Sequence, residues 1–255
     1  MATDKKFDDL NVRRVEAILL QHEIARSYFQ GELYNRDGSR LRALTIDTLN
    51  AGKLELDEVR CGRLFMIPDG SVVWALAVGE NQGAPEGLDV RSASLLLAEG
   101  EQNSAIVYRG EAGPEVWLDA LHIHRMMLAE HAPERLGTVA FGLMAVTAFR
   151  LGFEWISLFA AGHGPLPPEH SDAFVGYLVW PKFGFDAEVY AVELNRRPIN
   201  GLANCRTVQD ILALEADWWC HNGTARTMRF DLAPGSRSWS ILLHYLYENL
   251  AGDQS

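Results

Sequence analysis

Residues 136–160 read LGTVAFGLMAVTAFRLGFEWISLFA and join two apolar elements through a short break. Small and apolar residues fill Thr138–Leu151 on most sides, which is typical of a buried helix. Gly152 ends this helix, and the apolar run Glu154–Ala160 favours a strand. Arg150 and Glu154 interrupt the apolar stretch, which is therefore too short for a membrane span of about 20 nearly uncharged residues. The segment predicts a buried helix that leads into a buried strand.

Apolar residues upstream of this segment first follow helical spacing and then alternate. The helical spacing predicts one amphipathic helix over residues 8–30, which ends at Gly31. Strands are predicted near residues 44–46, 63–68, 72–78, 93–98, 104–109 and 116–124. The turn sequence Pro68-Asp69-Gly70-Ser71 separates two of these runs, and Asp-Gly is typical of a hairpin turn. The first half is therefore expected to be a helix followed by a largely antiparallel sheet.

The segments downstream of residue 160 alternate between loop and helix signals. Two glycines and three prolines within residues 162–168 predict a loop. A short helix over 171–180, stopped near Pro181, and a closing strand over 188–194 follow. Thr207, with Asp210 three residues later, predicts the start of a helix that reaches about Cys220, and a last helix carries Trp239. We expect residues 1–194 to form one domain, with residues 195–255 as a helical extension packed on it.

Charge and cysteine content narrow the class of partner and compartment. The chain has 23 Lys+Arg against 34 Asp+Glu, a formal net charge of -11, which argues against nucleic acid or an anionic membrane as partner. The same charge allows a cationic substrate. Cys61, Cys205 and Cys220 are far apart and form no CxxC motif, which indicates reduced thiols. The first ten residues are polar and lack the apolar core of a secretion signal, so we expect a cytoplasmic protein.

Three motifs carry a resemblance to a known family. They are LGT at 136–138, LGFEWISL at 151–158 and WPKFGF at 180–185. The chain resembles, over about residues 116–194, the GNAT superfamily of acetyl-CoA-dependent N-acetyltransferases. The resemblance implies an α+β fold with a central, mostly antiparallel sheet that is flanked by helices and contains splayed strands. It also implies acetyl-CoA, or another acyl-CoA, as cosubstrate, and an amine on a small molecule or protein as acceptor.

In this family a turn at a helix N-terminus binds the pyrophosphate of coenzyme A, because backbone N–H groups and the helix dipole favour an anion there. The resemblance assigns cofactor binding to Leu121, Ile123, Arg135, Leu136, Gly137, Thr138 and Val139. The turn departs from the family pattern, since Arg135 stands where the family has its first glycine and Ala132 where it has Arg or Gln. Arg135 either donates a charge-assisted bond to phosphate or fills the cradle with its bulk.

Two histidines stand where the resemblance places the reaction. His122 and His124 share one face of the predicted strand 116–124, because side chains of a strand alternate between faces. Acetylation of an amine needs a group that accepts a proton, and histidine has a suitable pKa. The pair is therefore a catalytic or substrate-orienting candidate, with His124 nearer the cofactor turn. A hydrogen-bonded structural pair and a metal site are the alternatives, but no third ligand follows at a recognisable spacing, so we expect no metal.

The family's acid position also departs from the pattern. Many members place a tyrosine four residues before the Gly of the GF pair, and this chain has Trp180 there. Tyr177 lies one helical turn earlier and is the candidate acid, unless both rings only pack the helix onto the sheet.

These departures leave a second function open, a non-catalytic GNAT-like module that binds a protein or small ligand in its cleft or on C-terminal aromatic residues. Trp218, Trp219 and Trp239 form that aromatic group. They fit core or subunit packing as well, which leaves a homodimer open.

Overall fold

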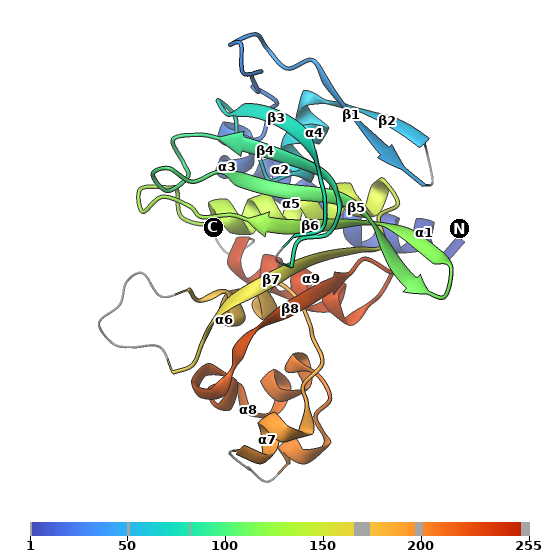
Figure 1. The fold of residues 1–255 in the computed structure, drawn as a ribbon, viewed down its shortest axis with the longest axis vertical. Coiled ribbons are helices and arrows are strands. Elements are labelled where there is room, and N and C mark those ends of the chain that lie inside the picture. Colours follow the sequence, from blue (N-terminus) through green and yellow to red (C-terminus); the bar gives the residue numbers. More distant parts are fainter. Residues whose placement is uncertain (1, 50–51, 82, 166–173, 197–200, 251–255) are drawn as a thin grey trace.

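The computed structural model describes residues 2–49, 52–81, 83–165, 174–196 and 201–250 (Figure 1). The elements of the first part are α1 (Ala2–Phe7), the π-helix η1 (Asp8–Val12), α2 (Arg13–Gln21), α3 (Glu23–Tyr28), β1 (Ala43–Thr48), β2 (Gly52–Asp57), α4 (Glu58–Leu64), β3 (Val72–Val78), β4 (Gly87–Ala93), β5 (Asn103–Gly113) and β6 (Val116–Arg125). The elements of the second part are α5 (Leu136–Arg150), β7 (Trp155–His163), α6 (Gly176–Lys182), α7 (Ala191–Arg196), the 3₁₀-helix η2 (Leu202–Asn204), α8 (Val208–Asn222), β8 (Thr224–Asp231) and α9 (Arg237–Leu250).

The described strands form two sheets. The larger has six strands in the order β3-β4-β5-β6-β7-β8, and β1 pairs with β2 in a separate hairpin. Neighbours in the larger sheet are antiparallel except β6 and β7, which are parallel. The fold is thus of the mixed α+β class, with an open, mostly antiparallel sheet flanked by helices (Figure 1).

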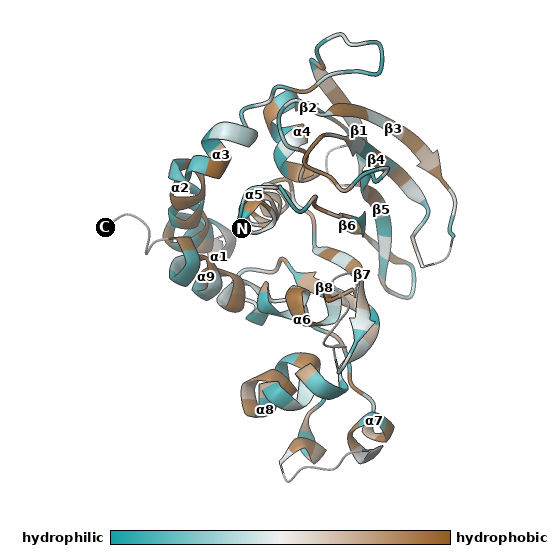
Figure 2. Cartoon of the chain, turned by 90° about the vertical axis from the view of Figure 1, so that its left-hand side faces the viewer, coloured by the Kyte–Doolittle hydropathy of each residue, from teal (hydrophilic) through white to brown (hydrophobic). Residues whose placement is uncertain are grey.

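Helix α5 lies at the centre of the core, as its sequence predicts. Most of its residues are buried, and it lies between the sheet and α2 and α9 (Figure 2). A helix that is apolar on most sides must be covered on most sides. Strand β7 follows it directly and is largely buried, so the predicted pair of buried helix and buried strand is confirmed. Among the described residues, no helix combines the length and apolarity that a membrane crossing requires.

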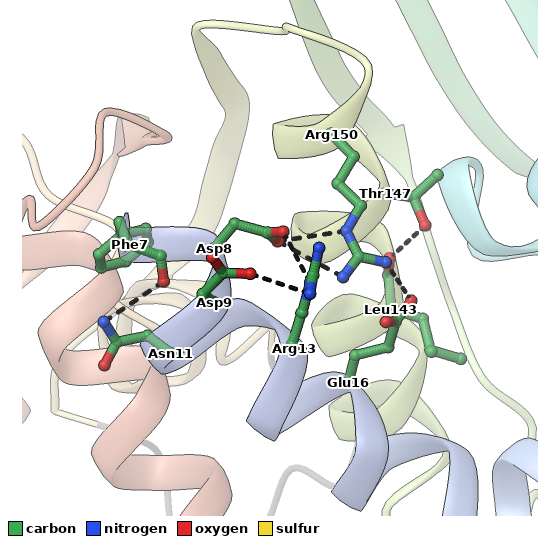
Figure 3. A network of polar contacts seen from close by, with 9 residues as sticks. All are labelled: Phe7, Asp8, Asp9, Asn11, Arg13, Glu16, Leu143, Thr147 and Arg150. Carbon is green, nitrogen blue, oxygen red and sulfur yellow. Dashed lines mark hydrogen bonds and ion pairs between the residues drawn. The ribbon is translucent and has the colours of Figure 1, made fainter. Parts of the chain in front are cut away.

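An ion-pair cluster joins the N-terminal helices to the last turn of α5 (Figure 3). Arg150 contacts Glu16 at 2.6 Å (Nη1 to Oε1) and Asp8 at 3.4 Å (Nε to Oδ1), and Arg13 contacts Asp8 and Asp9. These side chains are partly exposed, so each pair adds only about 0–1 kcal/mol. The cluster therefore contributes little to stability, and apolar residues such as Val12 and Val15 supply the burial of the N-terminal segment.

The single helix predicted over residues 8–30 is wrong, because the segment breaks at His22. The backbone of His22 is extended (ψ 140°), and its Nδ1 accepts the N–H of Ile24 at 3.2 Å. His22 thereby caps α3 and ends α2, so its side chain replaces the helical bond with a local one. Apolar spacing continues across the break, which is why the pattern concealed it.

The hairpin predicted at residues 63–78 is also wrong. Residues 58–64 form α4, whose N-cap Asp57 accepts the N–H of Arg60 at 2.7 Å, and only 72–78 forms a strand. Gly70 does adopt the positive φ (81°) expected of the turn. Asp69 accepts the N–H groups of Gln30, Gly31 and Glu32, each at 2.8 Å, which ties the turn to the end of α3.

Four further strand predictions have mixed outcomes. Strands 104–109 and 116–124 are confirmed by β5 and β6. The strand predicted at 93–98 is wrong, since β4 occupies Gly87–Ala93 and the following residues form a loop. The prediction near 44–46 lies within β1, as expected.

The closing strand predicted at 188–194 is wrong as well. Residues 191–196 form α7, and Glu193 reaches back to the N–H of Tyr190 at 3.0 Å, as the third residue of a helix often does. The edge of the sheet is instead formed by β8, which the sequence reasoning missed. Its alternation of exposed and buried side chains, with Met228 and Phe230 buried, is the signal that could have found it.

The C-terminal helices agree with prediction. Thr207 and Asp210 form a capping box at the start of α8, and α9 buries Trp239, Leu242, Leu246 and Leu250. Trp219 and Trp239 are almost fully buried within the chain. Cys61, Cys205 and Cys220 are free thiols. The predicted helix 171–180 is present from residue 176, and its first three residues, like 166–168 of the predicted loop, lie outside the described residues.

Candidate functional site

The two parallel strands separate at one end. Pairing between β6 and β7 covers four residue pairs and ends at Ile123 and Leu158, while β6 continues to Arg125 and β7 to His163. A groove of about 1500 Å³ lies at these ends of the strands and is lined by His122, Ile123, His124 and Leu158 at its base.

One wall of the groove is built from two loops that pair with each other. Ala98 N–H donates to Met127 O at 2.9 Å, and Ala129 N–H donates to Leu96 O at 3.0 Å. His131 Nε2 adds a contact of 2.9 Å to Leu95 O. These bonds hold residues 94–102 and 126–131 together, so the wall is formed without a ligand.

The opposite wall comes from β7 and from the start of α6. Its lining residues are Phe159, Ala161, Phe174, Val175, Gly176, Val179 and Trp180. Gly176 lies against β7 so closely that an added Cβ would stand 2.9 Å from Ala161 N. Glycine is therefore required where α6 begins, and it brings Phe174 and Val175 to the groove.

His122 and His124 share one face of β6, as period-two alternation predicts, with ring centroids 6.2 Å apart. His122 is only 3% exposed, whereas His124 is exposed. Burial, with a smaller contribution from His124, lowers the pKa of His122 from 6.5 to about 4. His122 is therefore neutral near pH 7, while His124 presents its ring to the solvent-filled groove.

A hydrogen-bond network fixes the ring of His122. Its Nδ1 lies 3.0 Å from Ser157 Oγ, and Ser157 Oγ lies 3.0 Å from Tyr108 OH and donates to Leu121 O at 3.2 Å. Trp155 Nε1 donates to Tyr108 OH at 2.8 Å. A serine hydroxyl has one proton, so donation to Leu121 O makes Ser157 the acceptor for Nδ1–H of His122. In that tautomer Nε2 of His122 carries no proton and is an acceptor.

Tyr108 and Ser157 were not predicted from the sequence. Both are placed by the sheet register, which pairs Tyr108 with Ala120 and Ser157 with His122. Tyr108, Ser157 and His122 therefore lie on the same face of the sheet. Alternation along each strand could have shown which face each residue takes, but only the pairing between strands brings them into one network.

The residues assigned to cofactor binding lie partly at the groove and partly behind it. All but two of them are buried, and Ile123 alone lines the groove, whereas Leu121, Leu136, Thr138 and Val139 do not. Gly137 is half-buried, and a Cβ added to it would meet Leu128, a lining residue, at 3.5 Å. Arg135 adopts the left-handed conformation (φ 68°) at the N-cap of α5. The N-terminus of α5 thus stands directly behind one wall of the groove.

The structure does not bring Tyr177 to the groove. Its side chain is buried, its hydroxyl donates to Cys220 O at 2.9 Å, and it is not among the lining residues. Trp180, in contrast, lines the groove and packs against Phe141 of α5. Within the described residues, no three His, Cys, Asp or Glu side chains are arranged to hold a metal ion.

Comparisons of the chain with family models, with curated proteins and with solved structures found no match. The geometry of the groove is therefore the basis for a functional proposal.

The lowered pKa of His122 predicts a pH-dependent stability. The unfolded chain binds a proton at His122 below about pH 6.5 and the folded chain only near pH 4, so this stabilisation is complete above pH 6.5 and is lost as the pH falls toward 4. The full pKa difference corresponds to about 3 kcal/mol. We expect the free energy of unfolding of His122→Asn, measured with urea, to fall less between pH 6.5 and 4.5 than that of the unaltered chain. Equal decreases would contradict this assignment.

Proposed function

We propose that the chain is a GNAT-like N-acyltransferase that moves an acetyl or related acyl group from coenzyme A to an amine. The observation that carries this proposal is the separation of two parallel strands at Ile123 and Leu158, with a groove and two histidines at that point. At about 1500 Å³ the groove exceeds the 300–1,000 Å³ typical of a site for one ligand. It thus has room for an acyl donor and an acceptor together, as direct transfer requires.

The chain order around the groove supports the resemblance beyond its motifs. Helix α5 connects the two parallel strands, and α6 follows β7. After the Gly184-Phe185 pair, Asp186 and Arg229 of β8 exchange two backbone bonds of 2.9 Å. Strand β8 therefore lies between β7 and the segment that follows the GF pair.

Three features of the described residues suit the binding of a coenzyme A thioester. Beyond Ile123 and Leu158 the facing edges of β6 and β7 no longer pair, so their backbone groups are placed to bind the amides of an extended ligand. The first turn of α5 contains no acidic residue, and its N-terminal dipole favours a phosphate. Gly137, half-buried in that turn, has no side chain. The thioester supplies the activated acyl group.

The two histidines divide the proton chemistry between them. His124 is exposed in the groove and accepts a proton from the ammonium form of the acceptor. The free amine nitrogen then forms a bond to the acyl carbon, and the C–S bond breaks with the electron pair leaving on sulfur. The second proton of the nitrogen passes to sulfur or to water, which yields an amide and a free thiol. His122, neutral and fixed by Ser157, orients the amine through Nε2.

Tyr177 has no part in this mechanism, because its hydroxyl is engaged with Cys220 O away from the groove.

The second candidate function, a non-catalytic binding module, draws support from Trp180 and Arg135, which depart from the family pattern. Arg135 is half-buried at the N-cap of α5, where the family has glycine.

Release of the coenzyme A thiol distinguishes the two functions. The chain is incubated with acetyl-CoA and a mixture of primary amines, and thiol release is followed with a disulfide reagent. The enzyme predicts release that depends on the amines and acylated amines detectable by mass spectrometry. Thiol release equal to that of a buffer control, with acetyl-CoA bound, would establish the non-catalytic module instead.

Replacing Gly137 by glutamate is expected to weaken acetyl-CoA binding by at least about 30-fold. The new carboxylate would stand at the N-terminus of α5, where it repels the pyrophosphate and occupies its place. A Cβ at Gly137 meets only Leu128, at the ordinary contact distance of 3.5 Å, so we expect little change in the thermal midpoint. Gly79→Glu is the matched control, because Gly79 is exposed, has nothing within 4 Å and lies outside the groove. Equal affinity in both variants would place the phosphates elsewhere.

A further inference from the structure

Exposed apolar side chains gather at the groove. Among the described residues Leu95, Phe174 and Phe159 line it and are 89%, 57% and 56% exposed. Val175 and Leu128, 40% and 36% exposed, also line it. Single exposed apolar residues are ordinary, but a contiguous group around one concavity marks a surface that a ligand covers.

These side chains come from both walls of the groove. Leu95 and Leu128 belong to the two loops that pair through Leu97 and Leu128, while Phe159 belongs to β7 and Phe174 precedes α6. The loop wall is held by backbone bonds and the other wall by β7, so the apolar surface is preformed. A ligand that enters here loses water from its own apolar surface without having to order the walls.

The charged residues of the groove are mostly acidic. Glu99, Glu101 and Glu130 line it, and Arg125 is the one Lys or Arg among the described lining residues. Arg125 contacts Glu101 at 3.0 Å, which offsets one negative charge with the positive one. Glu99 and Glu130 are exposed and leave the loop wall of the groove with a net negative charge, which attracts the cationic end of a ligand.

We propose that the acceptor bound here is a primary amine with an apolar body, such as an aromatic ring, that arrives as the ammonium ion. This inference rests on the proposed acyl transfer and names the acceptor class of the same groove. The carboxylates attract the ammonium group, His122 and His124 receive its N–H groups, and Phe159, Phe174 and Leu95 cover its apolar body. An apolar acyl chain would use the same side chains, and the comparison of octanoyl-CoA with acetyl-CoA below tests that alternative.

Binding of three small probes to the chain without coenzyme tests the inference independently of catalysis. The probes are 2-phenylethylamine, which has both features, ethanolamine, which lacks the ring, and phenylacetate, which carries the opposite charge. By calorimetry or NMR titration we expect 2-phenylethylamine to bind about 10- to 100-fold more tightly than either of the others. Equal affinities for 2-phenylethylamine and ethanolamine, or tighter binding of phenylacetate, would overturn the inference.

Two exposed aromatic residues provide a matched pair of variants. Phe159 lines the groove and is 56% exposed, and Trp117 lies on the β5–β6 hairpin outside the groove and is 53% exposed. Phe159→Ser is expected to reduce the preference for 2-phenylethylamine over ethanolamine by about tenfold, and Trp117→Ser to leave it unchanged. The same loss in both variants, or in neither, would count against the assignment of the ring to this wall.

Turnover separates failure of this inference from failure of the proposed function. With acetyl-CoA, kcat/KM is expected to be at least tenfold higher for 2-phenylethylamine than for ethanolamine. Equal kcat/KM values for the two amines would leave acyl transfer intact and overturn the acceptor class. A preference for octanoyl-CoA over acetyl-CoA that is lost in Phe159→Ser would also overturn it, because the apolar side chains would then bind the acyl chain. If no amine is acylated while the probes bind in the predicted order, the proposed function fails and the cationic, apolar ligand class stands.

Discussion

Replacing His124 by alanine should lower kcat/KM for acyl transfer by about 10²- to 10⁴-fold, the usual contribution of a general base. His124 lies exposed near the end of β6 in the groove, and there it is the candidate for taking the proton of the acceptor. Because the side chain is exposed, its removal leaves no cavity, and the free energy of unfolding should change by less than about 0.5 kcal/mol. Steady-state kinetics and urea unfolding measure the two quantities.

His244→Ala is the matched control for this variant. His244 is an exposed histidine on α9, paired with Glu248 at 3.2 Å and outside the groove. Its replacement should leave both activity and stability unchanged. Unchanged turnover in His124→Ala would remove His124 from the mechanism, and an equal loss in His244→Ala would show that the assay reports stability instead of chemistry.

Replacing Trp239 by alanine should lower the free energy of unfolding by about 3–5 kcal/mol, as for other large aromatic residues of a core. Trp239 is fully buried, its ring lies 5.6–5.7 Å from those of Phe7, Phe149 and Phe230, and its Nε1 donates to Leu232 O at 3.1 Å. Truncation therefore leaves a cavity and removes a buried hydrogen bond. Equilibrium unfolding in urea measures the loss.

The same helix offers a control for this large effect. Tyr247 lies on α9 and is 39% exposed, so Tyr247→Ala should cost less than about 1 kcal/mol. A similarly small cost for Trp239→Ala would contradict the burial of this ring between the N-terminal helix, α5 and β8. The last helix would then contribute little to the core.

Elements with continuous local signals could be predicted from the sequence. Residues 136–160 contain a helix that must be buried on most sides and a buried strand, and both continuous apolar runs are clear without knowledge of the rest of the chain. Thr207 and Asp210 carry the start of α8 in a four-residue pattern that is complete in itself. In each case the physical cause lies within the segment, in burial or in a cap.

Elements decided by single side chains or by distant partners were missed. The break at His22 depends on one ring nitrogen that accepts the N–H of Ile24, and α4 depends on Asp57 as its cap. Apolar spacing cannot show either. Strand β8 has a short alternating pattern, and its place at the sheet edge follows from its partners, β7 and Asp186, which are far away in the sequence.

The candidate site, like the fold, could be predicted only in part from the sequence. Alternation along one strand is enough to put His122 and His124 on one face, and the rings do lie 6.2 Å apart. The difference between them is tertiary, because Ser157 and the surrounding residues bury His122 while His124 stays exposed. The loop wall likewise depends on pairing between residues 96–98 and 127–129, which no local pattern announces.

The central claim is that the space between the separated ends of β6 and β7 holds an acyl-coenzyme A. Calorimetric titration of the chain with acetyl-CoA tests it most directly, because it needs neither the acceptor nor turnover. The account predicts one site per chain with a Kd on the order of 1–100 µM, which is weakened in Gly137→Glu and retained in Gly79→Glu. Absence of binding at millimolar acetyl-CoA would contradict it.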